Sequence, residues 1–153
     1  MGNYRREFYD AMMSFKKLKL SGVLSGITLM EHHALKAISV CSERNENVKV
    51  SQVVTEMEIP APGVSRLIGH MEDKGLVRRT VDTADRRSTF VAMTEKGGKL
   101  FAECESNLAE LGNRIFERMG DERSAELIRN LNLFIAYTDE EMKKMKEELE
   151  ERG

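Results

Sequence analysis

The sequence predicts a mainly α-helical fold with a small antiparallel β-hairpin, which places it in the α+β class. The chain has 153 residues with only 2 prolines, and its 41 % hydrophobic and 33 % charged residues are typical of a globular protein. Apolar residues recur at helical spacing along most of the chain, whereas residues 76–81 and 89–93 are rich in β-branched and apolar side chains. This length suits one domain with a real core, so we expect a single domain over residues 1–153.

The N-terminal part predicts two helices separated by a glycine-containing loop. In the first helix, about residues 4–20, one stripe is apolar, and the loop follows at residues 21–26. Thr28 then starts a second helix that runs to about Cys41, and Glu31 at its third position predicts a capping box. The apolar stripe of the first helix comprises Phe8, Met12, Phe15 and Leu18.

Two short helices follow. Residues 48–50 predict a short strand, and Ser51 is the expected N-cap of a helix that directs Val53, Val54 and Met57 inward. Residues 60–63, Pro-Ala-Pro-Gly, lead into a helix expected from Val64 to Lys74, which Gly75 ends in a left-handed conformation. The buried face expected for this second short helix comprises Val64, Leu67, Ile68 and Met71.

The remainder predicts a hairpin and two long helices. The strands at 76–81 and 89–93 are joined by the charged residues 82–88. A long helix begins after Thr94 and breaks near Gly120, and a last helix spans about residues 122–150. The apolar stripes of these helices either pack on the middle of the chain or pair with another copy. Because a compact domain of this size rarely shelters helices this long, we expect an obligate homodimer through the terminal helices.

Charge is unevenly distributed along the chain. The formal net charge is −2, yet residues 61–90 contain six basic and four acidic residues, whereas residues 139–153 contain four basic and seven acidic residues. A basic middle and an acidic tail are expected if only the middle meets a polyanion.

The order of helices and hairpin matches a winged helix-turn-helix, in which the second short helix enters the DNA major groove and the hairpin reaches the flanking backbone. Ser65 and Arg66 are the expected base contacts, because Ala61, Pro62 and Gly63 carry no side-chain donor. From the residues alone, a solvated helix face and a surface turn with an ion pair remain an open alternative. The further candidate DNA contacts are His70, Arg78 and Arg79 at phosphates, and Asp85, Arg86 and Arg87 at the hairpin tip.

Three motifs resemble the multiple-antibiotic-resistance regulator (MarR) family of bacterial repressors: EDKGLVRR at 72–79, DTADRR at 82–87 and VAMTEKG at 91–97. The resemblance implies a winged helix-turn-helix unit at about 28–94, flanked by long dimerisation helices at 1–27 and 95–153. It also implies a ligand-responsive repressor that binds a pseudo-palindromic operator in double-stranded DNA as a homodimer. In this family the wing arginine that enters the minor groove corresponds to Arg87, and its orienting carboxylate to Asp85. Ala84 departs from the arginine usual at its position, and residues 60–63 depart from the usual polar helix start.

The family likeness also implies a small aromatic or anionic effector bound near the junction of the N-terminal helices and the winged unit. Met12, Phe15, Met30 and His33 are the expected pocket residues. We expect no metal and no cofactor, since His32 and His33 are adjacent on a helix and diverge by about 100°.

Three alternatives stay open: a winged protein-interaction module, a metal-sensing regulator, and a redox-sensing regulator using Cys41 or Cys104. An enzyme is not expected, because the chain has no recognisable catalytic arrangement or phosphate-binding loop. The N-terminus has no apolar leader region, and no apolar run approaches the ~20 residues of a membrane span. We therefore expect a cytoplasmic protein.

Overall fold

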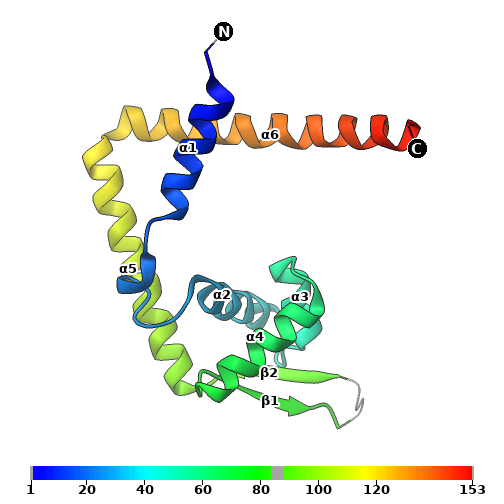
Figure 1. Ribbon diagram of the computed structural model, residues 1–153. Coiled ribbons are helices and arrows are strands. Elements are labelled where there is room, and N and C mark those ends of the chain that lie inside the picture. The colour runs from blue at the N-terminus through cyan, green and yellow to red at the C-terminus, as the bar shows by residue number, and fades with distance from the viewer. Residues whose placement is uncertain (1, 84–87, 153) are drawn as a thin grey trace. The chain divides into compact units, whose positions relative to one another are not determined.

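The computed structural model describes residues 2–83 and 88–152, and its helices and one hairpin confirm the predicted fold class (Figure 1). It forms two compact units, Met1–Leu108 and Ala109–Gly153. The elements in chain order are α1 Tyr4–Lys16, the 3₁₀ turn η1 Leu20–Gly22, α2 Leu29–Arg44, α3 Val50–Met57, α4 Ala61–Asp73, β1 Val77–Val81, β2 Thr89–Met93, α5 Glu95–Met119 and α6 Asp121–Glu151.

Helix α2 begins with the predicted capping box. The Glu31 backbone N–H donates to Thr28 Oγ1 at 3.2 Å, and the Thr28 N–H donates to Glu31 Oε2 at 2.8 Å. Two otherwise unpaired N–H groups at the helix start are thereby satisfied.

The start of α3 differs from the prediction. The helix begins at Val50, so Ser51 lies inside its first turn and is not the N-cap. The Lys49 N–H is instead satisfied by Gln52 Oε1 at 2.8 Å. The strand predicted at 48–50 is reduced to one antiparallel bridge between Lys49 and Phe90, because the helix takes over at the next residue.

Helix α4 starts three residues earlier than predicted, at Ala61. Pro60 is the N-cap and Pro62 lies in the first turn, where a missing N–H breaks no helical hydrogen bond. The Gly63 N–H donates to the Pro60 carbonyl at 2.9 Å, so residues 61–63 are helical. At the other end, α4 stops at Asp73, and Gly75 has the predicted left-handed conformation with a φ of 69°.

The turn between α3 and α4 is unusual. Glu58 has φ 53° and ψ 31°, a left-handed conformation that costs a non-glycine residue about 1 kcal/mol or more. Glu58 therefore stores strain in the turn that presents α4.

The hairpin pairs β1 with β2 in an antiparallel register that runs from Val77↔Met93 to Val81↔Thr89. Its second strand is tied to the helical part, because the Val91 N–H donates to the Val48 carbonyl at 2.8 Å. Thr94 then ends the hairpin and starts α5: its Oγ1 accepts from the Gly97 N–H at 3.0 Å and donates to the Gly75 carbonyl at 2.7 Å.

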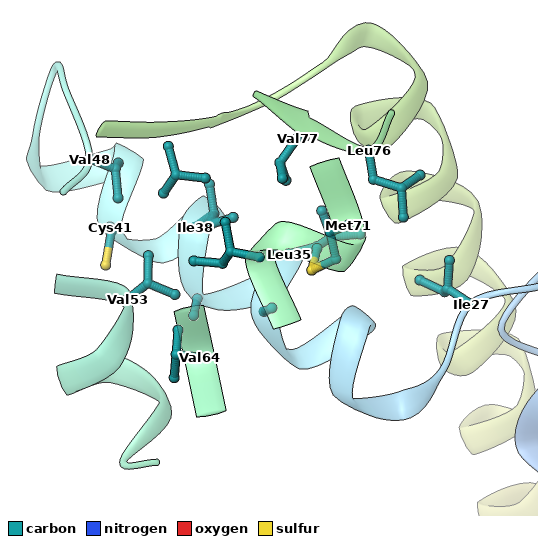
Figure 2. Packing of buried hydrophobic residues seen from close by; sticks show 14 of the residues in the cluster. Ile27, Leu35, Ile38, Cys41, Val48, Val53, Val64, Met71, Leu76 and Val77 are labelled. Atoms are coloured by element: carbon teal, nitrogen blue, oxygen red, sulfur yellow. The ribbon is translucent and has the colours of Figure 1, made fainter. Parts of the chain in front are cut away.

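The core of the first unit lies between α2, α3, α4 and the hairpin (Figure 2). Figure 2 shows Leu35 and Ile38 of α2 facing Val53 of α3 and Val64 of α4. On α4 the predicted apolar face is buried at Val64, Ile68 and Met71, while Leu67 is half-buried against the same core. This packing fixes which face of α4 turns outward.

In the second unit, α6 buries none of its side chains in a single chain. Exposure is high along its apolar stripe, with Leu131 53 % exposed. The large apolar residues that α6 exposes are Leu127, Ile128, Leu131, Leu133, Phe134, Ile135, Tyr137, Met142, Met145 and Leu149.

Candidate nucleic-acid interface

The outward face of α4 carries Ser65 and Arg66, both exposed, on the side away from the buried residues. Arg66 Nε donates to the Pro62 carbonyl at 3.2 Å, which holds the base of the guanidinium along the first turn of the helix. The two residues predicted to read bases are therefore accessible and lie next to each other.

A cavity of about 300 Å³ lies between the start of α3, α4 and the hairpin. Ser65 and Arg79, both predicted site residues, line it. Lys49 and Ser51 also line it, and sequence reasoning assigned neither to the site. The sequence feature that could have identified Lys49 and Ser51 is the short strand expected at 48–50, because such a strand brings the start of α3 next to the hairpin. The full lining is Lys49, Val50, Ser51, Val54, Ala61, Ser65, Ile68, Arg79, Ser88 and Thr89.

The predicted phosphate contacts Arg78 and Arg79 are in different environments. Arg79 Nε donates to Glu72 Oε2 at 2.7 Å, and its backbone N–H donates to Glu72 Oε1 at 2.9 Å. These hydrogen bonds lower the pKa of the Glu72 carboxyl below its ordinary value. Arg78 is exposed on β1 and lines a different cavity. Arg79 is therefore held in place by Glu72, while Arg78 faces solvent.

His70 is also exposed, with 62 % of its side chain accessible, but it has a partner that the sequence did not reveal. Its Nδ1 lies 3.2 Å from Oε1 of the buried Glu31. One ring nitrogen therefore faces the protein, and a phosphate contact would fall to the other.

The hairpin tip is only partly described. Asp85, Arg86 and Arg87 lie outside the described residues, so their predicted roles stay predictions. The flanking residues are ordered by a hydrogen bond from the Asp82 N–H to the Ser88 carbonyl at 3.0 Å. Asp82 Oδ2 also lies 3.7 Å from Lys49 Nζ, which joins the base of the turn to the start of α3.

The four residues predicted to line an effector pocket lie on α1 and α2. His33 lines a cavity of about 220 Å³ between α2 and α3, and Met12, Phe15 and Met30 are not among its lining residues. These three side chains are exposed on α1 and at the start of α2.

The histidines and cysteines bear on the metal and redox alternatives. His32 is buried with Nε2 2.8 Å from Glu105 Oε1, whereas the adjacent His33 is exposed. No group of three or more metal-ligating side chains occurs within residues 2–83 and 88–152. Cys41 and Cys104 are free and buried, and burial raises the pKa of both thiols. A raised pKa disfavours the thiolate that a redox sensor uses.

Along the part of the chain that the structure describes, no helix is both long and apolar enough to cross a membrane.

The geometry defines a winged helix-turn-helix protein, with α3 and α4 as the helix pair and the β1–β2 hairpin as the wing. Residues 25–88 match the model of the MarR family. The predicted resemblance to this family is confirmed by the match over residues 25–88.

Similar proteins agree with this match. The chain is 24 % identical over 90 residues to the HTH-type transcriptional regulator BilQ of Clostridioides difficile (strain CD3), covering 59 % of this chain and 61 % of BilQ. It is 31 % identical over 61 residues to the HTH-type transcriptional repressor MdtR of Bacillus subtilis (strain 168), covering 40 % of this chain and 39 % of MdtR. These matches span less than two thirds of either relative.

Among solved structures, the MepR–DNA complex of S. aureus is similar with a TM-score of 0.70 and 21 % identity. The similarity covers 90 % of this chain and 99 % of MepR, and it shows a shared fold.

Proposed function

We propose that this protein is a DNA-binding transcriptional regulator that acts as a homodimer on a pseudo-palindromic site in double-stranded DNA. The observation that carries the proposal is α4, which buries one apolar face and presents Ser65 and Arg66 outward near the paired strands β1 and β2. A helix presented in this way can enter a major groove while the hairpin reaches the adjacent backbone. The MepR–DNA complex, whose fold is shared, supports this mode of binding.

Base recognition falls mainly to two side chains. Arg66 can donate to guanine, Ser65 can pair with either kind of base, and Ala61 and Pro62 offer apolar contact to thymine methyl groups. A larger share of specificity falls to Arg87, which we propose reads a narrow minor groove by its charge. His70, Arg78 and Arg79 complete the proposed contacts at phosphates.

The homodimer is supported by the unburied apolar stripes of the terminal helices. Helices α1 and α6 have no buried residues in a single chain, although both carry large apolar side chains. A second copy of the chain is the partner that buries the same stripe on both sides. Two winged units related by this symmetry would read the two halves of a pseudo-palindrome.

The finer role we propose is that of a cytoplasmic repressor whose DNA affinity changes when a small aromatic or anionic molecule binds. The repressor role is supported by the similarity to MdtR, a transcriptional repressor, within the region that matches the MarR family model. The cavity beside His33 is the starting point for locating an effector, because it lies between α2 and the DNA-presenting helix pair.

The proposal predicts different losses for two arginine variants. Arg66→Ala should weaken binding by about 1–3 kcal/mol and relax base preference at one position, because it removes a base contact. Arg87→Ala should weaken binding and lower the salt slope, because it removes a charge held near the DNA. Fluorescence anisotropy titrations at several salt concentrations measure both quantities.

The control is Arg129→Ala, which removes the same charge from α6 and should leave affinity nearly unchanged. If Arg66→Ala matches the control in both affinity and base preference, α4 does not dock in the major groove as proposed.

A further inference from the structure

A buried carboxylate links the start of α2 to the end of the DNA-presenting helix α4. Glu31 is only 1 % exposed, and its Oε2 accepts the Thr28 N–H of the capping box at 2.8 Å. Its Oε1 accepts from Lys74 Nζ at 2.7 Å and lies 3.2 Å from His70 Nδ1. One carboxylate oxygen of Glu31 therefore belongs to the capping box of α2, and the other contacts the C-terminal end of α4.

Because Glu31 carries its charge in a buried position, this link depends on its partners staying in place. Burial by itself raises the pKa of the carboxyl, but the hydrogen bonds from Lys74 and Thr28 outweigh it and leave the pKa below its ordinary value. Glu31 is therefore ionised at neutral pH. A buried ion is tolerated only while its partners stay in place, so Lys74 cannot move far from Glu31 without a large energetic cost.

The end of α4 is held from a second side as well. Lys74 is the C-cap of α4, and its carbonyl accepts from Lys96 Nζ of α5 at 2.7 Å. Its side chain points to α2 while its carbonyl is bonded to α5. Hydrophobic burial is non-directional, whereas two satisfied polar contacts at one end of a helix add directional constraints on its orientation.

We propose that Glu31 is a positioning residue for DNA binding, which sets the orientation of α4 through Lys74 and His70 without touching DNA. This inference rests on the proposed function, because it assumes that α4 is the helix that enters the groove. A recognition helix must hold its side chains within a fraction of an ångström of the bases, so a small rotation at the Lys74 end misplaces Ser65 and Arg66.

Whether Glu31→Gln strengthens or weakens DNA binding distinguishes a positioning role of Glu31 from a simple electrostatic effect. Glutamine keeps an oxygen for the Thr28 N–H but loses the charge that holds Lys74. Removing a negative charge near a polyanion should tighten binding by electrostatics alone. Positioning predicts the opposite, a loss of about tenfold, with an unchanged salt slope because no phosphate contact is removed.

The matched control is Glu43→Gln, which removes the same charge from an exposed position on the same helix. It should leave affinity unchanged or slightly improved. Circular dichroism at the assay temperature verifies that each variant is folded, and anisotropy titrations on one DNA duplex give affinities and salt slopes.

Lys74→Gln provides the second arm, which also decides the matter if Glu31→Gln does not fold. If Lys74 acts through Glu31, Lys74→Gln should weaken DNA binding and leave the salt slope unchanged. The double variant Glu31→Gln/Lys74→Gln should then bind DNA no more weakly than the weaker of the two single variants. A slope lowered by about one would mean that Lys74 itself contacts a phosphate, and would overturn the proposal.

The outcomes also separate this inference from the proposed function. If the wild-type protein binds no DNA, the proposed function fails. If the wild-type protein binds and Glu31→Gln binds as tightly as Glu43→Gln, the positioning role of Glu31 fails and the DNA-binding function stands.

Discussion

Replacing Gly97 by alanine is expected to lower the free energy of unfolding by about 3 kcal/mol or more, the upper end of what overpacking costs. A Cβ at Gly97 would lie 1.9 Å from the Leu76 carbonyl oxygen. This oxygen belongs to the backbone just before β1, so it cannot rotate away as a side chain could. Helix α5 would have to move away from the winged unit and break the hydrogen bonds of Thr94.

Gly98→Ala is the control for this prediction, because it makes the same substitution one residue further along α5. Nothing lies within 4 Å of a Cβ at Gly98. Alanine is favoured over glycine inside a helix by roughly 0.5–1 kcal/mol, so this variant should be slightly more stable than the wild type. Urea denaturation at one fixed protein concentration compares them, and equal midpoints for the two variants would contradict the close contact.

Leu131→Glu is expected to dissociate the proposed dimer. Leu131 is 53 % exposed on α6 in a single chain, and it lies at the centre of the apolar stripe that we propose a second copy covers. Because the proposed dimer is symmetric, the substitution removes one leucine from each side of the interface. The free energy of association is therefore weakened by about 4 kcal/mol, or roughly a thousandfold in the dissociation constant. Burying the new carboxylates would add to this cost.

Ala136→Glu introduces the same charge on the same helix but about 140° away from Leu131 around the helix axis. It should remain dimeric. Sedimentation equilibrium of both variants and the wild type gives the association state directly. A wild-type monomer, or a Leu131→Glu protein that is dimeric like Ala136→Glu, would contradict a dimer built on this stripe.

Much of the fold could be predicted because the signals are local. The capping box of Thr28 and Glu31 and the left-handed Gly75 each depend on residues close in sequence, and both are present. The start of α4 was placed too late because residues 60–63 have the composition of a turn. A helix tolerates proline in its first turn, so composition alone does not separate the two.

The candidate site was only partly predictable. Helical periodicity was enough to place Ser65 and Arg66 on an exposed face of α4. The contact of Glu31 with Lys74 joins residues 43 apart, and no local pattern reveals it. Likewise, the ion pair of Arg79 with Glu72 forms only when β1 folds back beside α4. Charged residues thus showed where DNA could bind, while the partners that orient them required the tertiary structure.

The central claim, specific binding of DNA by the winged unit, is tested most directly by titrating the wild-type protein onto the promoter of its own gene. A scrambled duplex of the same base composition is the reference, and both titrations are repeated at rising salt. We predict saturable binding to the promoter that is at least about a thousandfold tighter than to the scrambled duplex and weakens as salt rises. Equal affinity for the two duplexes, or no binding to this promoter or to any neighbouring divergent promoter, would contradict the account.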